Sequence, residues 1–163
     1  MKPKMNLLAL PCLLCIVFTF TTTMVHAQQK PRATINHIAM TVNNLQTSAL
    51  FYKNILGLDT IAEPFHDGLH AWFSLGPKTA LHVIDKKLLP AGEPFIQTYS
   101  RGNHLCISIA SVDEQIAVLK KNHLTWVDWA GTVYGITSRP DGVKQIWFQD
   151  PDGSWIEVND AKE

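Results

Sequence analysis

The sequence predicts an α+β fold built from two similar halves. Two observations carry this prediction, because a strand followed by a helix occurs twice along the chain and a pair of later strands also occurs twice. Repetition of this kind fixes the architecture before any single element is certain. A third observation is that the residues between the halves lack apolar periodicity and hold several prolines and glycines, which is typical of a connecting loop.

Each half opens with the same strand and helix pattern. The two copies are "NHIAMTVNNLQTSALFYKNILGL" from Asn36 and "NHLCISIASVDEQIAVLKKNHL" from Asn103. In both copies, apolar residues first alternate and then recur at the spacing of one helix face. Asn44 is the expected N-cap of the first helix and Gly57 its expected C′ residue. In the second copy, Ser111 and Glu114 have the spacing of a capping box.

Each half closes with a second repeated pattern. The copies are "WFSLGPKTALHVID" from Trp72 and "WFQDPDGSWIEVND" from Trp147. Two aromatic residues precede a turn, and the strand after the turn has a polar residue at its centre, His82 in one copy and Glu157 in the other. Each half therefore reads as a strand, a helix and further strands. Residues 131–144 are expected to add strands and turns to the second half.

The first 27 residues read as a signal peptide, separate from the fold. A basic start precedes an apolar run, Leu7 to Phe20, which is too short to cross a membrane comfortably. Val25 and Ala27 then occupy the positions that a signal peptidase reads, so cleavage is expected after Ala27. The mature chain is expected to be exported, periplasmic or secreted, with no membrane contact after cleavage; an uncleaved N-terminal anchor is the alternative.

Composition narrows the class of the mature chain. The full sequence has equal numbers of acidic and basic residues, and cleavage removes Lys2 and Lys4, so the mature chain carries a small negative charge. The sequence has no basic patch of the kind that binds nucleic acid. A chain of this size is expected to form one domain with a hydrophobic core. Cys106 is the only cysteine that remains after cleavage, which excludes an intramolecular disulfide and favours a packing role.

Four polar side chains occupy equivalent places in the two halves. His37 and His104 stand near the starts of the first strands, each on a face of small residues, and His82 and Glu157 stand at the centres of the late strands. A carboxylate flanked by apolar residues is costly unless a cation or several donors face it. Any one of these histidines alone would be ordinary, but together the four suit a divalent transition metal. Three histidines without counterparts are expected in loops or on the surface, where His70 can also line a cleft mouth: His66, His70 and His123.

These segments resemble the vicinal oxygen chelate (VOC) superfamily, the glyoxalase/bleomycin resistance protein/extradiol dioxygenase family. The first repeated segment is similar to its opening strand and "FY…LG" helix, and "FQDPDGSWIEV" is similar to its closing hairpin. The resemblance covers residues 33–160 and implies paired βαβββ modules, the glyoxalase/bleomycin resistance/dioxygenase fold, whose curved sheets form a cup. The implied boundaries are 33–87 for module one, 88–102 for the connecting loop and 103–160 for module two.

The resemblance also implies a chemistry for the four polar residues. It matches the metal ligands of the family to His37, His82, His104 and Glu157, and it implies one divalent metal ion, zinc, nickel, manganese, cobalt or iron. Such relatives bind a small-molecule substrate through adjacent oxygens and stabilise an enediolate. Glu157 would be a fixed ligand or a ligand that detaches to act as the catalytic base. A homodimer is implied too, with the ligands either within one chain or shared between two.

The reaction type that the resemblance favours is that of a lyase or isomerase, glyoxalase I-like or epimerase-like. Glyoxalase I, or lactoylglutathione lyase, usually has glutamate where His82 stands, arginine where Thr41 stands and asparagine where Lys86 stands. An exported protein would also meet little glutathione. These departures favour a relative that acts on a different substrate.

Two alternatives stay open. An extradiol-type dioxygenase would hold iron on His37, His104 and Glu157. A non-catalytic protein would instead sequester a small molecule such as a drug or toxin, because a fold does not fix a function. The residues that could line such a pocket are Arg101, Trp129, Tyr134 and Trp147.

Overall fold

The computed structural model describes residues 33–95 and 100–162, and the predicted signal peptide, residues 1–27, lies outside them. The elements in chain order are β1 (His37–Val42), α1 (Leu45–Asn54), β2 (His70–Ser74), β3 (Ala80–Asp85), the 3-10 helix η1 (Lys86–Leu88), β4 (Leu105–Ser108), α2 (Val112–Lys121), β5 (Thr137–Ser138), β6 (Lys144–Gln149) and β7 (Trp155–Asn159). Within the described ranges, no helix combines the length and the apolar character that crossing a membrane requires.

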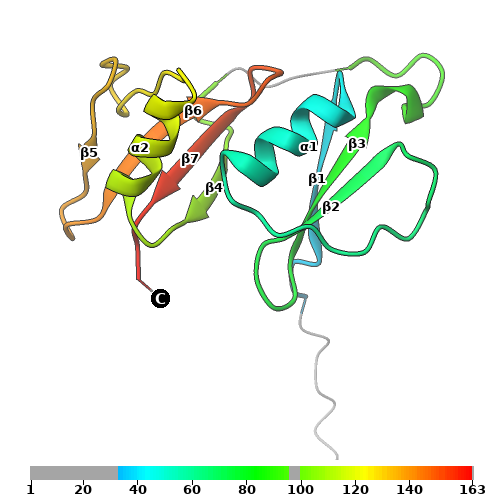
Figure 1. The fold of residues 1–163 in the computed structure, drawn as a ribbon, viewed down its shortest axis with the longest axis horizontal. Helices are drawn as coiled ribbons and strands as arrows, with labels where there is room; N and C mark the ends of the chain where they lie inside the picture. The colour runs from blue at the N-terminus through cyan, green and yellow to red at the C-terminus, as the bar shows by residue number, and fades with distance from the viewer. Residues whose placement is uncertain (1–32, 96–99, 163) are drawn as a thin grey trace, which may run out of the picture. The chain divides into compact units, whose positions relative to one another are not determined.

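The strands form two sheets, one in each half of the chain (Figure 1). In the first half the order is β1-β3-β2, with β1 parallel and β2 antiparallel to β3. In the second half the order is β4-β7-β6-β5, with β4 parallel and β6 antiparallel to β7. α1 packs against β2 and β3, and α2 packs against β6. The predicted α+β fold is confirmed, and in each half the first strand lies beside the last.

The first half has one strand fewer than the βαβββ pattern predicts. After α1, only an isolated bridge between Thr60 and Phe73 stands where a further strand would run. The carboxylate of Glu63 accepts the backbone N–H groups of Phe65 and His66, the latter at 2.6 Å, and His66 has a φ of 55°. Backbone groups that bond to a side chain and turn in this way are not available to a sheet ladder.

The predicted helix starts are confirmed. The Asn44 side chain accepts the backbone N–H three residues later at 3.0 Å, and the Ser111 hydroxyl does the same at 3.2 Å. Gly57 has the left-handed φ of 67° that favours glycine after a helix. However, the C-cap of α1 is Ile55, which makes Leu56 the C′ residue, so the prediction of Gly57 as C′ is wrong by one position.

One hydrophobic core joins the two halves. Its fully buried members include Tyr52, Phe73, Leu81, Leu119, Phe148 and Val158. Two buried polar contacts also cross between the halves, since the Tyr52 hydroxyl donates to the Asp150 carboxylate and the Gln115 amide donates to the Ile55 carbonyl, both at 2.8 Å. Burial raises the pKa of both Tyr52 and Asp150. Residues 34–163 accordingly form one compact unit.

Two edge strands face a pocket. β1 and β4 each stand at the edge of their sheet. A pocket of about 610 Å³ is lined by residues 38–41 of β1, by residues 103–106 at β4, and by Ser154 and Trp155. The start of β4, where His104 is expected to act, therefore borders open space.

Candidate metal centre

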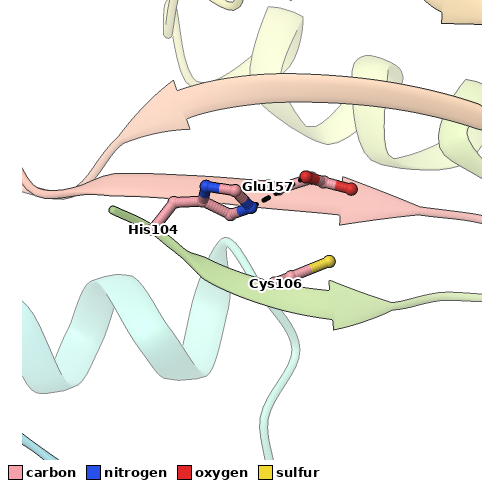
Figure 2. A group of neighbouring side chains, drawn as sticks. All are labelled: His104, Cys106 and Glu157. Atoms are coloured by element: carbon pink, nitrogen blue, oxygen red, sulfur yellow. Dashed lines mark ion pairs between the residues drawn. The ribbon is translucent and has the colours of Figure 1, made fainter. Parts of the chain in front are cut away.

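The second half brings three ligand-type side chains together (Figure 2). His104 stands just before β4, Cys106 lies in β4 and Glu157 lies in β7. The parallel register of the two strands places Cys106 directly opposite Glu157, and side chains two residues apart on a strand share one face. One ligand atom from each residue lies within 4.8 Å of the other two, and this is the one such group in residues 33–95 and 100–162.

A backbone carbonyl fixes the orientation of His104. Its Nδ1 lies 2.5 Å from the carbonyl oxygen of Arg101. Because a carbonyl oxygen can only accept, Nδ1 carries a proton and donates it, which leaves Nε2 to face Oε2 of Glu157 at 2.9 Å. A hydrogen bond from the second ring nitrogen is what orients histidine ligands in metal sites.

Glu157 is buried, and no lysine or arginine of the described residues forms an ion pair with it. The residue is 6% exposed and stands between Ile156 and Val158, which belong to the core. Gln145 and Asn159 donate amide N–H groups to its Oε1, and among the described residues its ion pair is with His104. Two amides and one imidazole stabilise a carboxylate less than a full positive charge does, so Glu157 can still accept a cation.

The Asn159 amide holds two members of the cluster in place. Its Oδ1 accepts from the Ser108 hydroxyl at 3.1 Å and from the Ala161 N–H at 3.2 Å. These two donors turn the amide nitrogen toward Cys106 Sγ and Glu157 Oε1, each at 3.1 Å. The buried Asn159 therefore sets the spacing between the sulfur and the carboxylate.

The packing role expected for Cys106 is wrong. The residue is exposed, and its sulfur contacts the Asn159 amide at the metal-type cluster. Desolvation of the sulfur raises the pKa of the thiol to about 12, and the negative charge of Glu157 adds to the shift. In the protein alone the thiol is therefore protonated and a poor nucleophile.

The first half brings the other two predicted ligands together. His37 and His82 have ring centroids 5.7 Å apart. His37 Nδ1 lies 2.7 Å from the side-chain oxygen of Asn36, which orients this ring as a backbone carbonyl does in the second half. Burial lowers the pKa of His82, and the imidazoles of His70 and His37 lower it further, so His82 is neutral and able to bind a metal near neutral pH.

His70 belongs to this first cluster, and its expected place in a loop or on the surface is wrong. It is the first residue of β2, is half-buried, and places Nδ1 2.8 Å from His82 Nε2. Its counterpart in the second half is Gln145, which also precedes a tryptophan by two residues and contacts the late-strand ligand. Extending the tryptophan repeat backwards, to "HAWF" and "QIWF", is the sequence signal that points to His70. The other two histidines are exposed as predicted: His66 and His123.

A tryptophan lies opposite the late-strand ligand in each half. Trp72 pairs with His82 across β2 and β3 and stacks on its ring at 3.9 Å. Trp147 pairs with Glu157 across β6 and β7, and its ring lies 6.4 Å from that of His104. Both indole N–H groups are buried and have no hydrogen-bond acceptor in the described part of the chain. Each half thus keeps one unused donor beside its ligands.

Three of the four residues expected to line a pocket lie next to the second cluster. Arg101 and Trp129 line a pocket of about 420 Å³ together with Trp155, and the Arg101 guanidinium lies 5.2 Å from the centre of that ring. Trp147 contacts Trp129, with ring centroids 5.5 Å apart. Tyr134 lines a different pocket.

The four predicted ligands thus lie in two pairs. Each half unites its own first-strand and late-strand residues, because β1 lies beside β3 and β4 lies beside β7. Among the described residues, no single group unites the first pair with the second. The four-ligand shell stays a prediction, either within one chain or shared between two.

Comparisons with known proteins point to one family. A family model described as the Glyoxalase/Bleomycin resistance protein/Dioxygenase superfamily matches residues 34–158. The chain is 30% identical over 130 residues to the metallothiol transferase FosB of Staphylococcus epidermidis, covering 77% of this chain and 80% of that protein. It is 31% identical over 134 residues to the lactoylglutathione lyase of Salmonella typhimurium, covering 78% and 92%. The crystal structure of a glyoxalase/dioxygenase from Nostoc punctiforme matches with a TM-score of 0.61 at 27% identity, covering 80% and 92%.

Proposed function

Because this chain belongs to the glyoxalase/bleomycin resistance protein/dioxygenase superfamily, we propose that it is a divalent-metal-dependent enzyme with lyase or isomerase chemistry. Its substrate is a small molecule with two adjacent oxygen atoms. Its metal ligands are His37, His82, His104 and Glu157. The observation that carries the proposal is the approach of His104 Nε2 to the buried Glu157 carboxylate, at 2.9 Å.

The His104 and Glu157 pair fits a divalent cation. The Nδ1 proton of His104 is committed to the Arg101 carbonyl, so Nε2 presents either a lone pair or a second proton to Glu157. Two lone pairs at 2.9 Å repel each other, and only a proton or a cation between them removes that repulsion. A borderline divalent ion accepts imidazole and carboxylate ligands together, so this donor set suits zinc, nickel, cobalt, manganese or iron.

Residues of the chain supply the proton transfer. A bound metal ion would act as a Lewis acid on the substrate oxygens. Glu157 is the only carboxylate among the four ligand positions, and its Oε1 is already held by the amides of Gln145 and Asn159. Oε2 is therefore the oxygen that binds the metal or, once detached, takes a proton from a substrate carbon.

The complete site in this proposal forms between two copies of the chain. The division of the ligands into two pairs supports it, as does the place of β1 and β4 at sheet edges. Edge strands have backbone groups that can pair with another chain. A two-fold dimer can set the first half of one copy against the second half of its partner, and symmetry then gives two equal sites.

The enzyme acts outside the cytoplasm in this proposal. The support is the signal-peptide pattern of residues 1–27, with Val25 and Ala27 before the expected cleavage point. N-terminal sequencing of the protein from the periplasm or the medium should begin at Gln28. A protein that stays in the cytoplasm contradicts this part of the proposal, and an exported protein that keeps Met1 assigns the alternative of an uncleaved anchor.

The proposed metal dependence is tested by metal analysis of the purified protein. The protein should contain bound divalent metal, and His104→Ala and Glu157→Ala should each lower its content strongly. His123→Asn is the matched control, because His123 is exposed and asparagine tolerates its φ of 57°. Protein that takes up no divalent metal even after incubation with zinc, nickel, cobalt, manganese and iron contradicts the proposal.

The reaction class is tested by turnover of three kinds of substrate with the metal-loaded protein. Hemithioacetals report glyoxalase-like chemistry, 2-methyl-branched acyl thioesters report epimerase-like chemistry, and catechols report extradiol cleavage. Turnover of either of the first two that is lost in Glu157→Gln supports the proposal. Turnover of catechols alone assigns the dioxygenase alternative. Metal binding without turnover of any of the three assigns the sequestering alternative, for which the pocket at Arg101 and Trp129 is the place to look.

A further inference from the structure

We propose that Cys106 is a metal ligand, and that its thiolate joins His104 and Glu157 in a three-residue ligand set carried by one chain. The inference rests on the proposed metal dependence and adds a sulfur donor to it. A sulfur ligand changes which metals the protein takes up, so the inference can be tested without any substrate.

The strand register gathers the three side chains. Cys106 and Glu157 lie opposite each other on β4 and β7, and His104 precedes Cys106 by two residues on the same face (Figure 2). Their ligand atoms lie within 4.8 Å of one another. Ligand atoms on one tetrahedral zinc ion lie about 3.3–3.8 Å apart, given bond lengths of about 2.0–2.3 Å. The limit of 4.8 Å exceeds this range by about 1 Å, a difference that a rotation of the Cys106 side chain within its rotamer well covers.

Hydrogen bonds hold Cys106 in place, as they commonly hold metal ligands. The Asn159 amide nitrogen donates to both Cys106 Sγ and Glu157 Oε1, and its orientation is fixed because Ser108 and Ala161 donate to the amide oxygen. Asn159 is 5% exposed, so this arrangement is part of the rigid sheet. Hydrogen bonds that hold ligands and tune them are a regular feature of metal sites.

Other common roles of a cysteine do not account for this arrangement. A packing role is excluded by the exposure of the residue. An intramolecular disulfide in the predicted mature chain is excluded because residues 28–163 contain no second cysteine. In the protein alone the thiol hydrogen-bonds to the Glu157 carboxylate, and a metal ion would take the place of the shared proton. On binding, the metal replaces the thiol proton, which passes to solvent, and a sulfur–metal bond forms with no change in oxidation state.

The thiolate predicts a preference among metals. Thiolate is a soft ligand that favours zinc, cobalt and cadmium, whereas manganese and magnesium favour sites made of oxygen donors. A set of imidazole, carboxylate and thiolate should therefore discriminate between cadmium and manganese more sharply than imidazole and carboxylate alone.

The test is cobalt substitution in a protein that carries Cys12→Ser and Cys15→Ser. In that background Cys106 is the only thiol, whether or not the first 27 residues are removed. The cobalt-loaded protein should show visible bands from bound cobalt and, in the near ultraviolet, a sulfur-to-cobalt charge-transfer band. Adding Cys106→Ser should abolish the charge-transfer band while the visible bands persist with a shift. Circular dichroism of each variant confirms that it is folded.

The outcomes separate this inference from the proposal on which it rests. Visible cobalt bands without a charge-transfer band would overturn the role of Cys106 and leave the metal dependence in place. Failure to bind cobalt at all would overturn the inference about Cys106, whereas the metal dependence falls only if zinc, nickel, manganese and iron are not taken up either. A competition between cadmium and manganese gives a second measurement, in which Cys106→Ala should lower the preference for cadmium by about tenfold or more. An unchanged preference would also overturn the inference.

Discussion

In the first half of the molecule the ligand-type cluster consists of three imidazoles, whereas in the second half it combines an imidazole, a thiol and a carboxylate. The positions are equivalent nonetheless. His82 and Glu157 each lie opposite a tryptophan, and each is contacted by the residue two places before that tryptophan. The two halves therefore share the same strand positions for these side chains but differ in the type of ligand atom found there. In the second half the buried Glu157 carboxylate is itself a member of the cluster and attracts a cation directly, whereas in the first half the Asp67 carboxylate is paired with His70 Nε2 at 3.4 Å.

The halves also differ in what covers their clusters. The first half lacks a strand after α1, and from that irregular segment Phe65 stacks on His70 with ring centroids 4.2 Å apart. The second half has the extra strand β5, and aromatic cover comes from Trp129, which contacts Trp147. The strands thus position the ligand-type side chains, whereas the irregular segments supply the residues around them. We expect those irregular segments to determine which substrate is selected.

The largest expected effect comes from disabling one half of the molecule at a time. His82→Ala and Glu157→Ala should each abolish activity, because each removes one ligand of the proposed shared set, the first from the first half and the second from the second half. Mixed dimers of the two variants should regain activity, since one of their two sites combines both intact halves. Random mixing should restore about a quarter of the sites of the unaltered dimer. The measurement is the specific activity of the mixture, with mass spectrometry of the intact dimers as its control.

No recovery in mixtures shown to contain mixed dimers would place the complete site within one chain. In that case the two pairs of ligands in a single chain would have to close on each other. Two copies of the same variant, mixed in the same way, show the baseline.

The contacts between the halves give a smaller effect that can be measured as stability. Tyr52→Phe removes the donor to the buried Asp150 carboxylate and should lower the free energy of unfolding by about 1–3 kcal/mol. Tyr134→Phe is the matched control, because Tyr134 is 60% exposed, and it should change stability by less than about 0.5 kcal/mol. Denaturant unfolding followed by tryptophan fluorescence and circular dichroism checks both. Equal effects of the two substitutions would argue against a structural link through Tyr52.

The smallest effects concern the two helix N-caps, which are equivalent in the repeat. Asn44→Ala and Ser111→Ala should each lower the free energy of unfolding by about 1 kcal/mol. If residues 34–163 unfold as one unit, the double variant should lose the sum within about 0.5 kcal/mol. Lys53→Ala, at the exposed end of α1, serves as the control. Two separate unfolding transitions would show that the halves are independent.

Much of the fold could be predicted because its signals are local. Alternation, helix spacing and capping residues each lie within a few positions of one another. Such local patterns predict the strand and helix of each copy and the caps at Asn44 and Ser111. The strand that the first half lacks could not be predicted. In the segment where it would run, the Glu63 side chain accepts the backbone N–H groups of Phe65 and His66, a contact that no periodic pattern indicates.

The candidate site was predictable in part. Period two places Cys106 on the face of His104, but its position opposite Glu157 depends on the register between β4 and β7, strands separated by about fifty residues. A single sequence does not show the register between distant strands, so it favours a packing role for the sulfur. His70 is not predicted for a different reason. Its counterpart in the second half is Gln145, so no pair of matching histidines marks this position.

The edge position of β1 affects the solubility of a chain that has not yet formed a dimer. Ile35, just before the strand, is 66% exposed, and Ile38 within it is 38% exposed. An apolar strand at a sheet edge recruits other strands, whether or not they are the right ones. A symmetrical partner would cover this edge, and a newly made chain that has not met one would be prone to precipitate. Solubility after synthesis would then depend on how fast two copies find each other, which makes protein concentration a variable to control whenever the metal-free chain is handled.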